Sequence, residues 1–62
     1  MEWNKNTLKE ARQKAKLSQA SLADELGVHF RTVQNWETGT TSIPTTVYLT
    51  LDNLFILISA TL

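Results

Sequence analysis

Apolar residues at helical spacing predict a first helix near the start of the chain. Its apolar face would consist of Leu8, Ala11 and Ala15. Thr7 and Glu10 have the spacing of a capping box, in which two side chains satisfy the first backbone N–H groups of a helix. Asn6 is a competing N-cap. These signals predict a helix from about Thr7 to Lys16.

A second, short helix follows almost at once. Ser18 is a good N-cap, because its hydroxyl accepts a hydrogen bond from a backbone N–H in the first turn. The inner face after it would be formed by Leu22, Ala23 and Leu26. Gly27 stands where a left-handed residue ends a helix, so the second helix is predicted to span Gln19 to Leu26.

A third helix is predicted between His29 and Gly39. His29 would be its N-cap, although serine or threonine is more usual at that position. Val33 and Trp36 lie three residues apart and form its buried stripe. Trp36 is therefore interpreted as a core residue, and Trp3 is interpreted as one as well. Gly39 ends the helix within a loop rich in threonine and serine.

Residues 43–62 form a strongly apolar segment with two possible structures. As a helix, the segment carries one apolar stripe, made of Val47, Leu51, Leu54, Phe55, Ile58 and Leu62. As strands, residues 47–51 and 54–58 would flank Asp52 and Asn53 in a two-residue hairpin. Local propensity favours the strands and periodicity favours the helix. The helix is our prediction, and the hairpin is the alternative.

The segment from Gln19 to Thr38 meets the requirements of a helix-turn-helix. Ala23 is small enough for two helices to approach closely, Gly27 supplies the turn, and Val33 reaches back into a shared core. The predicted fold class is therefore all-α, a compact bundle of four to five short helices. An α+β fold with a C-terminal β-hairpin after the third helix is the alternative.

Composition and charge limit the chain to a few classes of protein. Its 62 residues allow one domain, residues 1–62, with a helix-turn-helix and an apolar segment 43–62 for the core and for dimerisation. There are 6 basic and 6 acidic residues and no cysteine, which excludes disulfides and thiolate metal sites. Every lysine and arginine lies at or before Arg31, so the front half of the chain is basic.

Between Thr7 and Gly39 the chain resembles the Cro/C1-type, or XRE-like, helix-turn-helix family of phage and bacterial repressors. The residues that carry the resemblance are Leu17-Ser18-Gln19, Leu22-Ala23, Leu26-Gly27-Val28, Val33, Trp36-Glu37 and Gly39. It implies a lambda-repressor-like DNA-binding domain of five helices, with the third helix in the major groove. It also implies that Arg12 pairs with Glu37. The family commonly has a glycine between its fourth and fifth helices, where this chain has Phe55.

The outward face of the third helix supplies candidate contacts to DNA bases. With Val33 and Trp36 directed inward, the exposed residues would be Phe30, Arg31, Gln34 and Asn35. Arginine pairs with guanine, and glutamine or asparagine pairs with adenine, through two hydrogen bonds each. A phenylalanine can contact a thymine methyl group. We therefore predict these four residues as the base-contacting set.

Candidate phosphate contacts come from several elements. The resemblance implies that Gln19 binds a phosphate at the start of the second helix, where backbone N–H groups favour an anion in any case. Lysines and hydroxyl residues complete the predicted set, which is Lys14, Lys16, Thr38, Thr40 and Thr41.

Catalysis and cofactor binding are not indicated. His29 is the only histidine, with no cysteine and no clustered carboxylates around it, so neither a metal site nor a catalytic constellation is predicted. No cofactor or small-molecule ligand is evident. The apolar tail is interrupted at Asp52 and Asn53 and is too short to span a bilayer, so we expect a cytoplasmic protein without a membrane partner.

The predicted function is a sequence-specific regulator that binds double-stranded DNA. It would repress transcription as a homodimer on a near-palindromic operator. The predicted dimer interface is Leu54, Phe55, Ile56, Leu57, Ile58 and Leu62. One alternative is a protein–protein interaction module, similar to an antitoxin or an antirepressor, that uses the apolar C-terminal segment. Another is a DNA-binding fragment of a longer regulator.

Overall fold

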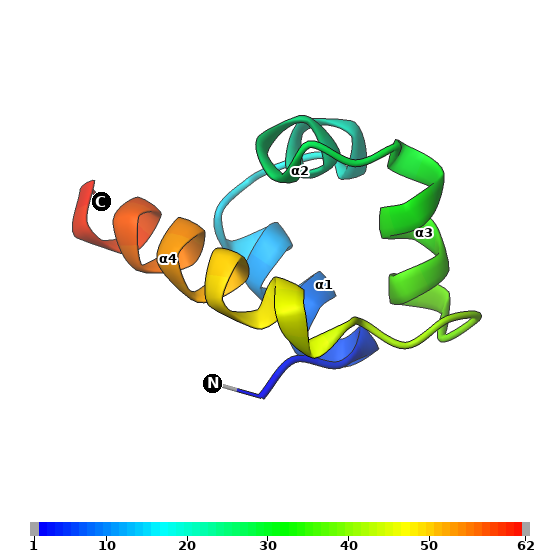
Figure 1. The fold of residues 1–62 in the computed structure, drawn as a ribbon. Coiled ribbons are helices and arrows are strands. Elements are labelled where there is room, and N and C mark those ends of the chain that lie inside the picture. The colour runs from blue at the N-terminus through cyan, green and yellow to red at the C-terminus, as the bar shows by residue number, and fades with distance from the viewer. Residues whose placement is uncertain (1, 62) are drawn as a thin grey trace.

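The computed structural model describes the backbone of residues 2–61 and the side chains of residues 2–57. It contains four helices, which are α1 (Lys5–Lys14), α2 (Gln19–Leu26), α3 (Phe30–Thr38) and α4 (Thr45–Thr61). Figure 1 shows α2 at one end of the bundle, α3 along one side, and α4 extending away from α3. Residues 2–61 contain no β-strand, so the all-α prediction is confirmed and the hairpin alternative is wrong.

The first helix begins two residues earlier than predicted. Its N-cap is Asn4, whose side chain accepts hydrogen bonds from the backbone N–H groups of Asn6 (2.9 Å) and Thr7 (3.0 Å). The Thr7 hydroxyl in turn accepts from the backbone N–H of Asn4 at 2.9 Å, which completes a capping box. Thr7 is therefore the third helical residue of the box, and the prediction of Thr7 as its N-cap is wrong.

The first helix also ends earlier than predicted. It stops at Lys14, and Lys16 takes a left-handed conformation with a φ of 59°. The backbone N–H of Leu17 donates back to the carbonyl of Arg12 at 3.1 Å, which satisfies a carbonyl of the last turn. This reversal turns the chain toward α2, so Lys16 belongs to the connection and not to the helix.

The bounds of α2 and α3 agree with their predicted caps. The Ser18 hydroxyl accepts from the backbone N–H of Ser21 at 3.0 Å. Gly27 and Gly39 end the two helices with φ values of 72° and 80°, a region that residues with a Cβ rarely adopt. Because the turn after Gly27 is so short, α2 and α3 pack directly against each other, and α3 also packs on α1.

The core joins all four helices and the residues that flank them. Its buried side chains are Trp3, Leu8, Leu22, Ala23, Val33, Trp36, Ile43 and Leu51. Val33 and Trp36 are 0% and 4% exposed, so the predicted phase of α3 is confirmed. Trp3 is also buried, as interpreted from the sequence, whereas Ile43 is a core residue that the sequence analysis did not predict.

The segment 45–61 forms one continuous helix. The resemblance implied a fifth helix, but α4 passes through Phe55 without a break, because no glycine is present there to end it. Leu51 is buried, and Val47, Leu54 and Phe55 pack against the core, as the helical stripe predicted. None of the described helices has the length and apolar character needed to cross a membrane.

The N-terminal segment is attached to α4. The indole Nε1 of Trp3 donates to the carboxylate of Asp52 at 2.8 Å, and the Tyr48 hydroxyl donates to the carbonyl of Trp3 at 3.0 Å. The ring of Trp3 lies 5.4 Å from that of Phe55, measured between centroids. These contacts fix α4 against the residues that precede α1.

Candidate nucleic-acid interface

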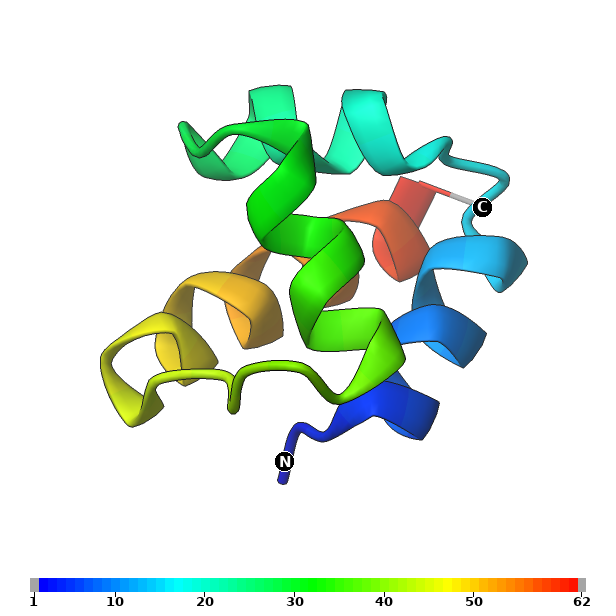
Figure 2. The ribbon, with the colours of Figure 1, turned by 90° about the vertical axis from the view of Figure 1, so that its right-hand side faces the viewer.

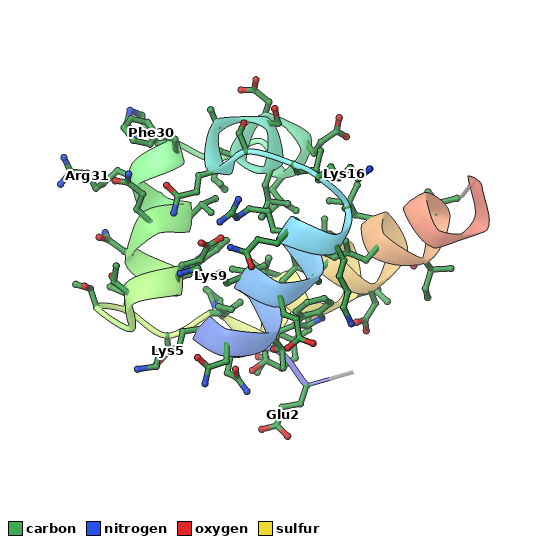
Figure 3. All side chains as sticks on the ribbon, turned by 180° about the vertical axis from the view of Figure 1, so that it is seen from behind. Glu2, Lys5, Lys9, Lys16, Phe30 and Arg31 are labelled. Carbon is green, nitrogen blue, oxygen red and sulfur yellow. The ribbon has the colours of Figure 1, made fainter. Side chains whose placement is uncertain are left out.

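The outer face of α3 forms one side of the molecule. Figure 2 looks onto this helix, which lies in front of the other three. Phe30 and Arg31 are exposed and project away from the body of the protein at the start of α3 (Figure 3). Gln34 and Asn35 are half-buried. The four predicted base-contacting residues therefore all reach the surface, and the first turn of α3 is the most accessible part.

The first turn of α3 is stabilised by His29. Its imidazole Nδ1 accepts a hydrogen bond from the backbone N–H of Arg31 at 3.1 Å, and its carbonyl accepts from the backbone N–H of Thr32 at 2.9 Å. The predicted N-cap is thus confirmed. The imidazole also lies beside the ring of Phe30, with 5.1 Å between the ring centroids.

A hydrogen-bonded ion pair holds α3 in position against α1 and α2. The Arg12 guanidinium donates to the two carboxylate oxygens of Glu37, at 2.7 Å from Nε and 3.0 Å from Nη2. Its Nη1 donates to the carbonyl of Leu17 at 2.8 Å. The pairing of Arg12 with Glu37 that the resemblance implied is confirmed.

Gln19 takes part in the same network. Its side-chain amide donates to a carboxylate oxygen of Glu37 at 3.2 Å. The side chain predicted to bind a phosphate is therefore used within the protein, where it joins the start of α2 to the end of α3. The sequence could not indicate this contact, because eighteen residues separate the two partners.

Three hydroxyl residues gather where α3 ends. Thr38, Thr40 and Thr41 are all exposed. The hydroxyls of Thr38 and Thr40 lie 2.9 Å apart, and the backbone N–H of Thr41 donates to the carbonyl of Asn35 at 3.3 Å. The structure thus brings these predicted phosphate-contacting residues together at one end of the α3 face.

Lys5 is a cation at this end of α3 that the sequence interpretation missed. Its Cδ atom lies 3.2 Å from the position that a Cβ would occupy at Gly39, so the lysine crosses directly over the glycine backbone. Lys5, Gly39 and Thr41 border a cleft of about 220 Å³. Only the tertiary contact identifies Lys5, since no local pattern relates it to the loop.

The two lysines predicted as phosphate contacts lie elsewhere. Figure 3 shows Lys5 and Lys9 on the side of α1 nearer α3, and Lys16 on the side away from it. The side chain of Lys14 is 77% exposed, and its Nζ lies 3.4 Å from the carboxylate of Glu10 one turn earlier. The cations that flank the α3 face are therefore Lys5 and Lys9.

The fold and this face define a helix-turn-helix protein of the kind that binds DNA. A family model described as helix-turn-helix matches residues 8–60. The chain belongs to the Cro/C1-type, XRE-like helix-turn-helix family of DNA-binding transcriptional regulators. This is a family of regulatory domains and not of enzymes. No curated protein and no solved structure shows significant similarity to the chain.

Proposed function

We propose that the protein is a cytoplasmic, sequence-specific repressor that binds a near-palindromic operator as a homodimer. Residues 1–62 act as one DNA-binding domain, with α3 in the major groove. The observation that carries the proposal is the exposed first turn of α3, a helix whose last turn is held against α1 by the ion pair of Arg12 and Glu37. Repression needs no chemistry from the protein, because occupancy of the operator is enough to block transcription.

Base readout is led by the two residues that project furthest. The Arg31 guanidinium can donate to both acceptors of a guanine, and the Phe30 ring can contact a thymine methyl group. Gln34 and Asn35 follow on the next turn, where partial burial restricts their side chains and favours a defined hydrogen-bonding geometry. All four predicted base contacts are retained in the proposal.

Phosphate binding is assigned to two groups beside α3. One is the first turn of α2, whose backbone N–H groups favour an anion next to Gln19. The other is the end of α3 and the loop after it, where Thr38, Thr40 and Thr41 are exposed and the Nζ of Lys5 lies 3.7 Å from the position of a Cβ at Gly39. The loop itself has no cation, so Lys5 supplies the positive charge there. Lys16 lies on the side of α1 away from α3 (Figure 3), and Lys14 is half a turn round α1 from Lys5, so both contribute less.

Three substitutions separate base contacts from phosphate contacts. Arg31→Ala is expected to lose about 1–3 kcal/mol of binding free energy and to relax the preference at one base position. Lys5→Gln is expected to weaken binding to all sequences alike and to lower the slope of log affinity against log salt by about 1. Lys14→Gln is the matched control, with little expected effect.

The measurement is selection of bound sequences from a random DNA pool, followed by titration at several salt concentrations. The proposed readout by α3 is contradicted if the parent binds every sequence equally and Arg31→Ala leaves binding unchanged. The assignment of Lys5 is contradicted if Lys14→Gln lowers the salt slope as much as Lys5→Gln does.

The proposed dimer surface lies on α4. Leu49, Ile56 and Leu57 are 69%, 65% and 66% exposed, which is unusual for large apolar side chains so close together on one helix. Of the interface predicted from the sequence, Ile56 and Leu57 belong to this surface. Leu54 and Phe55 are partly buried and pack against the core, on the inner side of this surface. The side chains of Ile58 and Leu62 lie outside the described residues.

The shape of the protein suits a two-fold pair. The C-terminal end of α4 points away from α3, so pairing through α4 leaves both α3 faces free (Figure 1). Each molecule is 31 Å along its longest axis. The proposal requires the two copies of α3 to be spaced by about one turn of DNA, roughly 34 Å, which is the separation of successive major grooves on one side of the duplex.

Two charge insertions on α4 test the dimer. Ile56→Lys and Leu57→Lys are expected to convert a dimer into a monomer, because each places two ammonium groups close together at the two-fold axis. Gln13→Lys, on the exposed side of α1, adds the same charge away from the surface and is expected to leave the dimer intact. Sedimentation at micromolar concentration measures all three. A monomeric parent contradicts the proposed dimer.

A protein–protein interaction module is the second candidate. One observation favours it, namely that the exposed apolar surface of α4 offers a binding face for a different protein. In that case the Ile56→Lys variant loses its activity in the cell, whereas Arg31→Ala retains it. The repressor proposal expects Arg31→Ala to lose the activity.

A further inference from the structure

His29 has a defined protonation pattern because of its capping bond. A backbone N–H can only donate, so the Nδ1 atom that accepts from Arg31 at 3.1 Å must carry a lone pair. In a neutral imidazole the proton then lies on the other nitrogen, Nε2. The cap therefore fixes His29 as a hydrogen-bond donor on its outer side.

The direction of this donor is also fixed. Nδ1 faces the first turn of α3, so Nε2–H is directed away from the helix, and His29 is exposed to solvent. The ring of Phe30 lies against the imidazole at 5.1 Å between centroids and restrains it a second time. Phe30 and Arg31 project outward at this end of α3 (Figure 3), so the imidazole beside Phe30 shares their surface.

Capping alone does not account for a histidine at this position. Serine, threonine, aspartate and asparagine are the preferred N-caps and would satisfy the same N–H group. Histidine differs from serine and threonine in presenting a second polar atom well beyond the helix end. At a position that faces the proposed DNA surface, this second atom can donate a hydrogen bond to DNA.

We propose that His29 binds DNA as a neutral hydrogen-bond donor through Nε2–H. Its partner is an acceptor oxygen or nitrogen, either on a backbone phosphate or on the major-groove edge of a purine, where guanine presents N7 and O6. The inference rests on the proposed DNA-binding function and adds to it a contact that the residues of α3 do not provide. One side chain thus caps the recognition helix and extends its contact surface.

Two cap-preserving substitutions test the contact. Serine and asparagine at position 29 both accept the hydrogen bond from the backbone N–H of Arg31, and both remove the imidazole. His29→Ser and His29→Asn are therefore expected to unfold thermally at or above the temperature of the parent. We expect both to bind the selected DNA about three- to tenfold more weakly, which is the range for one lost hydrogen bond.

The pattern of the loss identifies the acceptor. Relaxed preference at one base position in the pool selection assigns a purine edge, whereas an equal loss on all sequences assigns a phosphate, and either result supports the inference.

Several outcomes overturn the inference. Unchanged affinity and selectivity in both variants, while the parent binds a specific sequence, refutes the contact and leaves the proposed function standing. A loss in only one variant assigns the effect to the cap geometry. A parent that binds no DNA overturns both proposals.

Discussion

Glu37→Ala is expected to destabilise the domain by about 3–5 kcal/mol, because it leaves the Arg12 guanidinium buried without a counter-charge. The side chains of Arg12 and Glu37 are only 12% and 3% exposed, so water has little access to the guanidinium when the carboxylate is lost. The substitution also removes the acceptor of the Gln19 amide. For 62 residues, about 0.05–0.15 kcal/mol per residue gives a total stability of only about 3–9 kcal/mol.

A second ion pair in the same protein is the matched control. Lys14 and Glu10 are 77% and 66% exposed, and their charged atoms lie 3.4 Å apart. Because surface pairs contribute about 0–1 kcal/mol, Glu10→Ala is expected to change stability very little. Chemical denaturation followed by helical circular dichroism measures both variants. Equal effects of Glu37→Ala and Glu10→Ala would contradict the role given to the buried pair.

Paired substitution distinguishes a buried charge from lost packing. Arg12→Met combined with Glu37→Leu removes both charges and retains most of the apolar volume. It is expected to cost less than Glu37→Ala alone, since no uncompensated charge is left in the interior. DNA binding by the double variant then distinguishes two roles of the network. Weaker binding indicates that the network positions α3, and unchanged binding indicates that it only stabilises the fold.

Trp36→Ala is expected to cost about 3–5 kcal/mol and to leave much of the chain unfolded at 25 °C. Trp36 is 4% exposed and belongs to the core cluster that joins all four helices. Its truncation opens a cavity that such a small core has few residues to fill. The expected result is a loss of the cooperative thermal transition, together with a large fall in helical content.

Phe30→Ala is the control for Trp36→Ala. Phe30 is 42% exposed and lies outside the core, so removal of its ring is expected to cost far less stability while weakening DNA binding. A Trp36→Ala variant that unfolds at the same temperature as Phe30→Ala would show that the inward face of α3 is not the main support of the fold.

The sequence by itself determined the elements whose signals are local. Ser18, Gly27 and His29 act on backbone groups within a few residues of themselves, so the bounds of α2 and the start of α3 could be predicted from them. The phase of α3 and the helical state of residues 45–61 also followed from the sequence. Apolar periodicity records which face is buried, and in α4 it outweighed the local preference for strands.

Only the tertiary structure decided the contacts between residues far apart in the chain. Gln19 turned inward to Glu37, and Lys5 came to lie over Gly39 at the end of α3. Trp3, two residues before α1, is likewise anchored to Asp52, forty-nine residues away. Such contacts arise when whole helices pack, and their geometry depends on every side chain in the core, so no local spacing encodes them.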